Sequence, residues 1–110
     1  MLRGEVWWIE FPQARGGEIQ KTRPAIIVSN DSFNRTMNRV QVVPVTSNTK
    51  KLYPGEALVT IGDRTSKALV NQIATVTKER VQNRIGAVST EELAAVEKAI
   101  VYQLALEGGT

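Results

Sequence analysis

The spacing of apolar residues changes once along this chain, at Ser89, and that change limits the folds open to it. Before Ser89, apolar residues form short runs bounded by Gly, Pro, Asn and Asp, as β-strands do. After it, Leu93, Val96, Ile100 and Leu104 recur at spacings of three and four, as on one face of an amphipathic helix. This order predicts a mainly β fold that is covered by one C-terminal helix.

Six or seven short strands are expected before the helix, at residues 4–11, 24–29, 40–46, 56–61, 68–77 and 84–88, the fifth with a possible break at Asn71-Gln72. Pro44 lies inside the third segment. Because proline donates no backbone hydrogen bond, it predicts an edge position or a bulge there. The strands are expected to form a small, strongly bent antiparallel sheet or partly open barrel, closed on one side by the helix.

The start of the helix carries a specific local signal. Ser89-Thr90-Glu91-Glu92 has the form of a capping box, with Ser89 as the N-cap and Glu92 three residues later. We expect the helix to run from Thr90 to about Leu106 and to end at Gly108-Gly109.

Length and composition narrow the chemistry. The 110 residues are expected to form a single domain, 1–110. The chain has neither cysteine nor histidine, which excludes a cysteine nucleophile, a disulfide scaffold, a zinc finger, a Ser-His-Asp triad and a paired-histidine nuclease. Asp and Glu form no dense cluster, so no metal and no other cofactor is expected.

Charge is distributed unevenly. The net charge is +3, but residues 1–90 carry +6 and residues 91–110 carry −3. A basic body of this kind suits a polyanion such as a nucleic acid, with the acidic helix facing away from it. No apolar stretch has the length of a membrane span or a signal peptide, which predicts a cytoplasmic protein with no membrane partner.

Three polar clusters interrupt the predicted strands. Each has an ordinary explanation as exposed charge or a strand end, but strand ends in a small barrel can also meet at one site. Asn71-Gln72 is the least ordinary, because two amides in an apolar strand need partners or a groove. The clusters are Glu18, Gln20, Lys21 and Arg23; Thr46-Ser47-Asn48 with Lys50-Lys51; and Asn71-Gln72.

The order of several short motifs resembles the MazF/PemK family of toxin endoribonucleases, over nearly the whole chain. Each motif is weak alone, and their order and spacing together are specific. The motifs are Arg3-Gly4-Glu5-Val6-Trp7-Trp8, the ten residues 21–30 (KTRPAIIVSN), Val43-Pro44-Val45-Thr46-Ser47 with Tyr53-Pro54, Asn71-Gln72-Ile73, and Arg84-Ile85-Gly86 before the helix.

The resemblance implies a small SH3-like or CcdB-like barrel, which agrees with the strand pattern. It implies a homodimer that cleaves single-stranded RNA, such as mRNA, at a short recognition sequence and without a metal. The 2′-hydroxyl would attack the adjacent phosphorus, giving 2′,3′-cyclic phosphate and 5′-hydroxyl ends. It also implies a cognate antitoxin whose acidic C-terminal segment occupies the RNA groove.

The family's catalytic arginine and threonine correspond to Arg23 and Thr46. A guanidinium suits the charge that develops on the phosphate oxygens, and Thr46 would orient the phosphate or the 2′-hydroxyl. Glu18 is a candidate base. The residues expected to bind RNA are Gly17, Glu18, Gln20, Lys21, Ser47, Asn48, Lys50, Lys51, Asn71 and Gln72. The three lysines would hold phosphates, and the other residues would read bases.

The sequence also departs from the family pattern. Many relatives have an acidic residue at the position of Asn71, some have a second arginine near Leu69, and many have one at Ala74. The change to Asn71 is expected to alter base preference. The main alternative function is a CcdB-like toxin of the same fold that binds gyrase and cuts nothing. A third is an inactive barrel that binds RNA.

Overall fold

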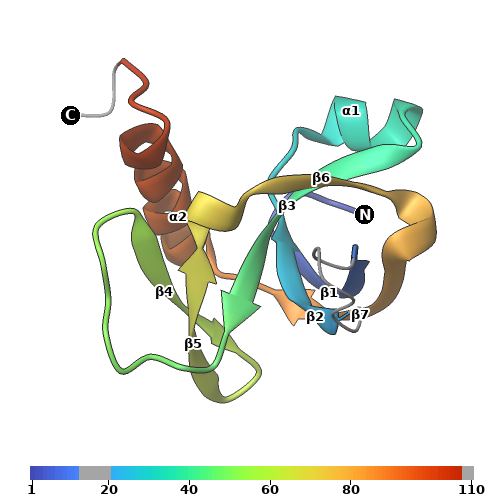
Figure 1. The fold of residues 1–110 in the computed structure, drawn as a ribbon. Coiled ribbons are helices and arrows are strands. Elements are labelled where there is room, and N and C mark those ends of the chain that lie inside the picture. The colour runs from blue at the N-terminus through green and yellow to red at the C-terminus, as the bar shows by residue number, and fades with distance from the viewer. Residues whose placement is uncertain (13–20, 108–110) are drawn as a thin grey trace.

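A computed structural model describes residues 1–12 and 21–107 of the chain (Figure 1). It has seven strands, two α-helices and two short 3-10 turns within that part. The elements are β1 (Glu5–Phe11), β2 (Lys21–Ile27), α1 (Asp31–Thr36), β3 (Arg39–Thr46), β4 (Glu56–Ile61), β5 (Arg64–Leu69), η1 (Val70–Gln72), β6 (Ala74–Thr77), η2 (Lys78–Arg80), β7 (Val81–Ala87) and α2 (Thr90–Gln103).

The strands form one bent antiparallel sheet. Their order is β4-β5-β3-β2-β1-β7, and β6 pairs with β3 beside the β5 pairing. The two end strands of this order, β4 and β7, contact each other, so the sheet curls toward a barrel. This confirms the predicted mainly β fold with a C-terminal helix.

The central strands are buried on both faces, and successive residues serve two separate apolar clusters. In β3, Val40 and Val42 belong to one cluster, whereas Val43 and Val45 belong to the other. The second of these clusters packs under α2 through Val96 and Ala99. Burial on two faces explains the continuous apolar runs at residues 25–27 of β2 and 42–45 of β3.

Pro44 contradicts the edge position predicted for it. It is buried in β3, a central strand, and lies opposite Ala25 of β2. On the other side of β3, pairing with β6 ends at Val42 and pairing with β5 begins at Val45. Pro44 falls in this interruption of the ladder, where a residue without an N–H is tolerated in an interior strand.

Helix α2 begins as the capping box predicts. The Ser89 hydroxyl accepts a hydrogen bond from the Glu92 N–H, and the Glu92 carboxylate accepts one from the Ser89 N–H. Glu92 also accepts a bond of 2.6 Å from the Thr60 N–H, which ties the helix to β4. Burial opposes ionisation, but these hydrogen bonds outweigh it and lower the pKa of Glu92.

The helix ends at Gln103, before the predicted Leu106, and Gly108-Gly109 lie outside the described residues. Within residues 1–12 and 21–107, no helix combines the length and apolarity that a membrane crossing requires.

Candidate functional site

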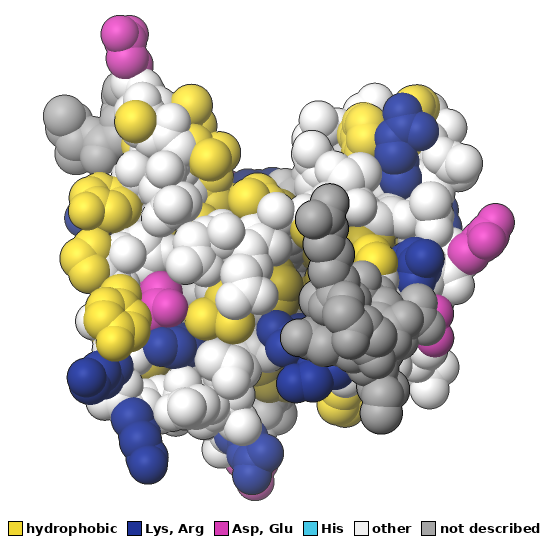
Figure 2. Space-filling view, in the orientation of Figure 1, with side chains coloured by type: hydrophobic (Ala, Val, Ile, Leu, Met, Phe, Trp, Pro, Cys, Tyr) yellow, Lys and Arg dark blue, Asp and Glu magenta, His cyan; other side chains and the backbone are white. Residues whose placement is uncertain are grey.

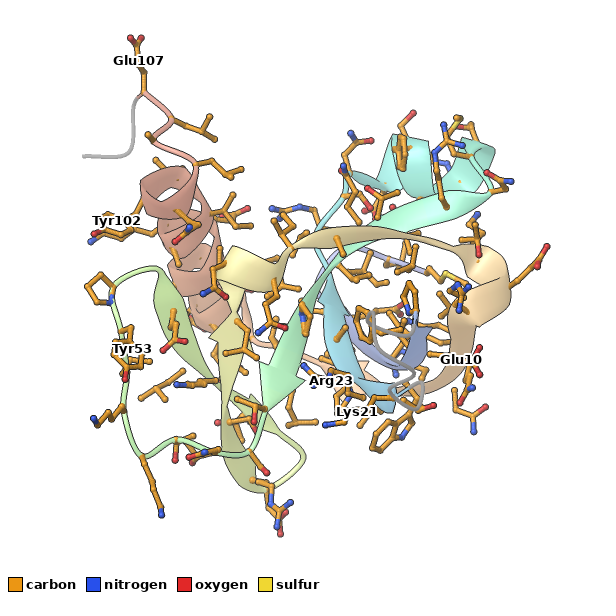
Figure 3. All side chains as sticks on the ribbon, in the orientation of Figure 1. Glu10, Lys21, Arg23, Tyr53, Tyr102 and Glu107 are labelled. Carbon is orange, nitrogen blue, oxygen red and sulfur yellow. The ribbon has the colours of Figure 1, made fainter. Side chains whose placement is uncertain are left out.

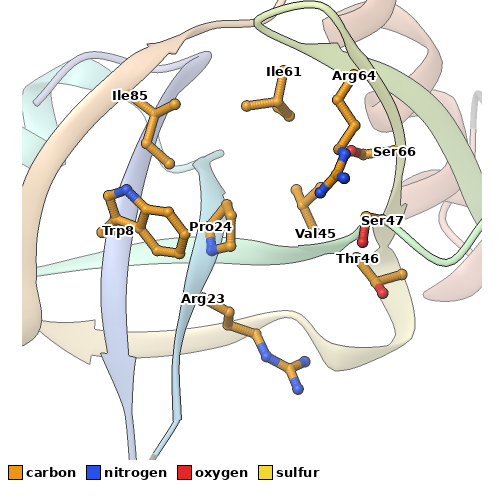
Figure 4. Close-up of a pocket in the computed structure, with 10 residues that line it drawn as sticks. All are labelled: Trp8, Arg23, Pro24, Val45, Thr46, Ser47, Ile61, Arg64, Ser66 and Ile85. Carbon is orange, nitrogen blue, oxygen red and sulfur yellow. The ribbon is translucent and has the colours of Figure 1, made fainter.

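A groove of about 390 Å³ is lined by residues of β2, β3 and β5 and by Trp8 of β1 (Figure 4). One part of its wall is apolar and the other is cationic and hydroxylic. The lining residues are Trp8, Arg23, Pro24, Val45, Thr46, Ser47, Ile61, Arg64, Ser66 and Ile85.

Arg23 and Thr46 reach this groove from neighbouring strands. In the β2–β3 pairing, Ala25 lies opposite Pro44, and the same register continued by two residues places Arg23 opposite Thr46. Directly opposed residues of an antiparallel pair have side chains on one face and close together. The structure therefore brings together the two residues that the sequence singled out for catalysis.

The Thr46 hydroxyl is held by the loop that follows it. Its oxygen accepts a hydrogen bond of 3.2 Å from the Asn48 N–H, and Asn48 Oδ1 accepts one of 3.3 Å from the Lys50 N–H. One lone pair of the hydroxyl oxygen is thus engaged, and the hydroxyl donates to no acceptor among the described residues, which leaves its proton for a ligand oxygen.

Arg64 is a second groove cation that the sequence analysis missed. It begins β5 directly after the β4–β5 turn, and Figure 4 shows its guanidinium turned into the groove near Val45 and Ser66. From sequence, Asp63-Arg64 read as an ordinary turn, and only the pairing of β5 with both β3 and β4 places Arg64 here.

The charges of the groove are unbalanced. Among the residues that the structure describes, no carboxylate lies within ion-pair distance of Arg23 or Arg64, and none of the groove's lining residues is acidic. The four ion pairs present there use other cations: Arg3, Lys67, Arg80 and Arg84. The groove therefore presents two guanidinium groups to an anionic ligand.

The two adjacent tryptophans have different roles. The Trp7 indole N–H donates to Glu5 Oε1 at 3.1 Å, and Glu5 also pairs with Arg84 of β7 at 2.9 Å. Burial opposes ionisation of Glu5, but these bonds and the Leu2 N–H lower its pKa. Trp8, on the other face of β1, is 40% exposed and lines the groove. An exposed aromatic face there offers a stacking surface for a planar ligand.

Lys67 behaves unlike the groove cations. Its ammonium is buried beneath the loop after Thr46, where it donates to the Lys51 carbonyl at 2.6 Å and to Glu56 Oε1 at 3.0 Å. It also lies 5.4 Å from the centre of the Tyr53 ring. Burial opposes ionisation of Glu56, but bonds from the Tyr53 N–H and from Lys67 lower its pKa.

The other predicted RNA-binding residues divide into three sets. Ser47 lines the groove, and Asn48, Lys50 and Lys51 continue from it along an exposed loop. Lys21 is exposed at the start of β2, at the same end of the strand as Arg23 (Figure 3). Gly17, Glu18 and Gln20 lie outside the described residues.

Asn71 and Gln72 are not among the groove's lining residues. They are exposed in η1, a 3-10 turn between β5 and β6, so the predicted break in the fifth strand is present. Two amides fit there because the turn leaves them in solvent. In the described parts of the chain, no three His, Cys, Asp or Glu side chains gather as metal ligands would.

Comparison with known proteins gives consistent matches. The family model described as "PemK-like, MazF-like toxin of type II toxin-antitoxin system" matches residues 2–104. Endoribonuclease MazF9 of Mycobacterium tuberculosis (strain ATCC 25618 / H37Rv) is 42% identical over 115 residues, covering 96% of this chain and 98% of that protein.

Two solved structures share the fold. A mycobacterial structure described as an endoribonuclease in complex with its cognate antitoxin superposes with a TM-score of 0.79 at 25% identity, covering 96% of each chain. MazF from Deinococcus radiodurans superposes with a TM-score of 0.80 at 24% identity, again over 96% of each chain.

Proposed function

The chain belongs to the family of PemK-like, MazF-like toxins of type II toxin–antitoxin systems, and from this premise we propose that it is a sequence-specific endoribonuclease acting on single-stranded RNA. One observation carries the proposal. Arg23 and Thr46 share a groove with a second guanidinium and an exposed tryptophan, and no described carboxylate pairs with either arginine.

The reaction needs neither an imidazole nor a bound metal. The 2′-hydroxyl gives its proton to a base, for which Glu18 is the candidate, and attacks the adjacent phosphorus, while the bond from phosphorus to the 5′-oxygen breaks and that oxygen takes a proton from water. The products are a 2′,3′-cyclic phosphate and a 5′-hydroxyl. Negative charge concentrates on the non-bridging oxygens in the transition state, and a guanidinium can donate to two of them at once.

The polar residues of the groove and its aromatic residue have roles in this scheme. Arg23 stabilises the developing charge, and the Thr46 hydroxyl donates a hydrogen bond to a phosphate oxygen. Arg64 holds a neighbouring phosphate from the opposite wall, and Trp8 stacks on a base. The backbone phosphates on either side are bound by Lys21, Lys50 and Lys51. The base edges are read by the remaining polar residues predicted to bind RNA, which are Gly17, Glu18, Gln20, Ser47, Asn48, Asn71 and Gln72.

End-mapping on a long RNA of defined sequence tests the proposal. The purified protein in a chelating buffer should cut at a recurring short sequence and leave the two ends named above. DNA of the same sequence should stay intact, because it lacks the 2′-hydroxyl. Intact RNA at high protein concentration would contradict the proposal, and inhibition of gyrase by that preparation would support the gyrase-binding alternative.

The antitoxin of this chain is proposed to carry an acidic C-terminal segment that occupies the same groove. Two guanidinium groups without a described carboxylate partner suit an acidic peptide as well as RNA. A synthetic acidic C-terminal peptide of the antitoxin should therefore compete with RNA, and the competition should weaken as salt increases.

The active form is proposed to be a homodimer built through the face of α2 and β4. Large exposed apolar side chains gather there, over a groove of about 510 Å³. Figure 2 shows them along the side of α2 and β4, and Figure 3 places Tyr53 and Tyr102 on that side. Among them are Leu52, Tyr53, Leu58 and Tyr102, whose exposed fractions are 47–63%.

A twofold axis through this face would let one apolar patch cover its copy. Leu58→Arg places a charge on that patch and should convert a dimer to a monomer in analytical ultracentrifugation, whereas Leu2→Arg, at an exposed apolar residue of the N-terminus, should not. A wild-type monomer at all concentrations would contradict the homodimer.

A further inference from the structure

Lys67 is a buried cation with more partners than its own ion pair requires. Its side chain is 10% exposed, and its carboxylate partner Glu56 is 8% exposed. Besides Glu56, the ammonium donates to the Lys51 carbonyl at 2.6 Å and lies over the Tyr53 ring at 5.4 Å. Both of these additional partners belong to the loop of residues 47–55, which follows Thr46.

The backbone of Lys67 also adjoins the proposed catalytic threonine. In the β3–β5 pairing, Lys67 lies directly opposite Thr46. Lys67 therefore contacts the loop at two places. Its backbone pairs with Thr46, just before the loop begins, and its ammonium binds the carbonyl of Lys51 in the middle of the loop. The loop is closed at its end by Glu56, whose carboxylate accepts from the Tyr53 N–H at 2.8 Å.

Two hydrogen bonds between residues close in sequence continue from this anchor back to the Thr46 hydroxyl. The Lys50 N–H donates to Asn48 Oδ1 at 3.3 Å, and the Asn48 N–H donates to the Thr46 hydroxyl oxygen at 3.2 Å. The peptide group that joins Lys50 to Lys51 neighbours the carbonyl that Lys67 holds. The position of the Thr46 hydroxyl therefore depends on a loop whose fixed point is the buried ammonium.

We propose that Lys67 is a positioning residue for RNA cleavage, which acts through the loop of residues 47–55 on the Thr46 hydroxyl. The inference rests on the proposed function, and it assigns Lys67 no contact with RNA. The loop also carries Ser47, Asn48, Lys50 and Lys51, so the same anchor sets where these side chains meet the substrate.

If the Lys67–Glu56 ion pair had only a structural role, its effect would fall on the stability of the fold. It would stabilise the barrel by joining β4 to β5, which already pair along their whole length from Glu56 to Ile61. The bond to the Lys51 carbonyl adds nothing to that sheet and restrains only the loop. Loss of a restraint near a reacting group alters the rate more than it alters the fold, because small displacements of a catalytic group are costly.

The test is a double-mutant cycle in single-turnover cleavage of an RNA whose sites have been mapped for the wild type. The anchor is removed by Lys67→Met together with Glu56→Gln, which leaves no unpaired charge buried. This pair of changes is made both in the wild type and in Thr46→Val. Folding is checked by circular dichroism and the melting temperature.

A matched control uses the other cation that joins a carbonyl to a carboxylate. Arg3 donates to the Val28 carbonyl at 2.9 Å and pairs with Glu97 of α2 at 2.6 Å, away from the loop of residues 47–55. Arg3→Met with Glu97→Gln removes the same kinds of contact from a more exposed pair. The control should therefore leave the cleavage rate within about twofold of the wild type, as expected of contacts that do not touch the site.

In the wild-type background, removing the Lys67 anchor should lower the saturating cleavage rate on the order of 10- to 100-fold. In the Thr46→Val background the same change should have a much smaller effect, because the hydroxyl that it positions is gone. The inference would be overturned if removing the anchor lowered the cleavage rate by the same factor in both backgrounds, or if the folded variant cut RNA at the wild-type rate. No cleavage by the wild type would overturn the proposed function itself, and this inference with it.

Discussion

Two kinds of cation flank the end of β3, and their surroundings differ. On one side Lys67 is buried and bound to a carboxylate, a carbonyl and an aromatic ring. In the groove, Arg23 and Arg64 have no ion-pair partner among the described residues. Figure 2 shows Lys and Arg side chains gathered along the lower part of the molecule.

Lys67 is bound by other groups of the protein, whereas Arg23 and Arg64 have no described carboxylate partner and are proposed to bind a ligand. A buried charge is stable only with its partner, so removing the partner is costly for folding. Arg64 is exposed and Arg23 is partly exposed, so a guanidinium there costs the fold little without a carboxylate, and we expect it to stabilise a phosphate in the transition state. We therefore expect the two kinds of cation to have different roles, which mutation can separate.

Lys67→Met should show the largest effect on stability. It leaves the Glu56 carboxylate buried without its cation, and the free energy of unfolding should fall by about 3–5 kcal/mol. Urea denaturation measures this, with Lys67→Met plus Glu56→Gln as the control, which should recover most of the loss. A loss below about 1 kcal/mol, as for an exposed pair, would remove the distinction between Lys67 and the groove cations.

Arg23→Ala should show the opposite pattern. Its cleavage rate should fall by roughly 10²–10³-fold, as when one charge-stabilising donor is removed, while the melting temperature stays close to that of the wild type. Arg23→Lys should recover only part of the rate, because an ammonium lacks the planar fork. A folded Arg23→Ala variant that cuts RNA at the wild-type rate would exclude Arg23 from the mechanism.

Arg64→Gln should weaken RNA binding more than it slows the chemical step. Removing one phosphate contact from a single strand should reduce the slope of log K against log salt by about 0.7. Arg39→Gln is the matched control, since Arg39 is exposed at the opposite end of β3 and should leave the slope unchanged. Equal slopes for Arg64→Gln and the wild type would show that Arg64 holds no phosphate.

Acid should destabilise the fold through the carboxylates that the structure holds ionised. The pKa of Glu5, Glu56 and Glu92 is lowered from an ordinary 4.5 in the folded state. The unfolded chain therefore takes up protons first as pH falls, and stability is lost below about pH 4.5. Denaturation at pH 3 to 7 should show this loss, with a shallower slope after Lys67→Met plus Glu56→Gln. An unchanged slope in that variant would contradict the assignment to Glu56.

The parts of the fold that are specified locally could be predicted from the sequence. The capping box at Ser89 and Glu92 begins a helix wherever it precedes an apolar stripe, and it does so here. The apolar run at residues 24–29 predicted a buried strand, and β2 is buried over its last three residues. Arg23 and Thr46 were identified through a family resemblance, and the strand register then placed them together.

The features that depend on long-range pairing could not be predicted. Pro44 predicted an edge position or a bulge, because nothing local shows that β3 is a central strand that changes partner beside it. Arg64 and Lys67 lie three residues apart on β5, yet one lines the groove and the other is buried under a loop. Only the pairing of β5 with β3 and β4 determines those environments.

The most direct measurement uses an RNA that carries one mapped cleavage site and a single 2′-deoxynucleotide immediately 5′ of the scissile phosphate. Attack by the 2′-hydroxyl in the groove of Arg23 and Thr46 predicts that this RNA stays intact at that position. The unsubstituted RNA should be cut to a 2′,3′-cyclic phosphate and a 5′-hydroxyl. Cleavage of the deoxy-substituted RNA at the same phosphate would contradict the account.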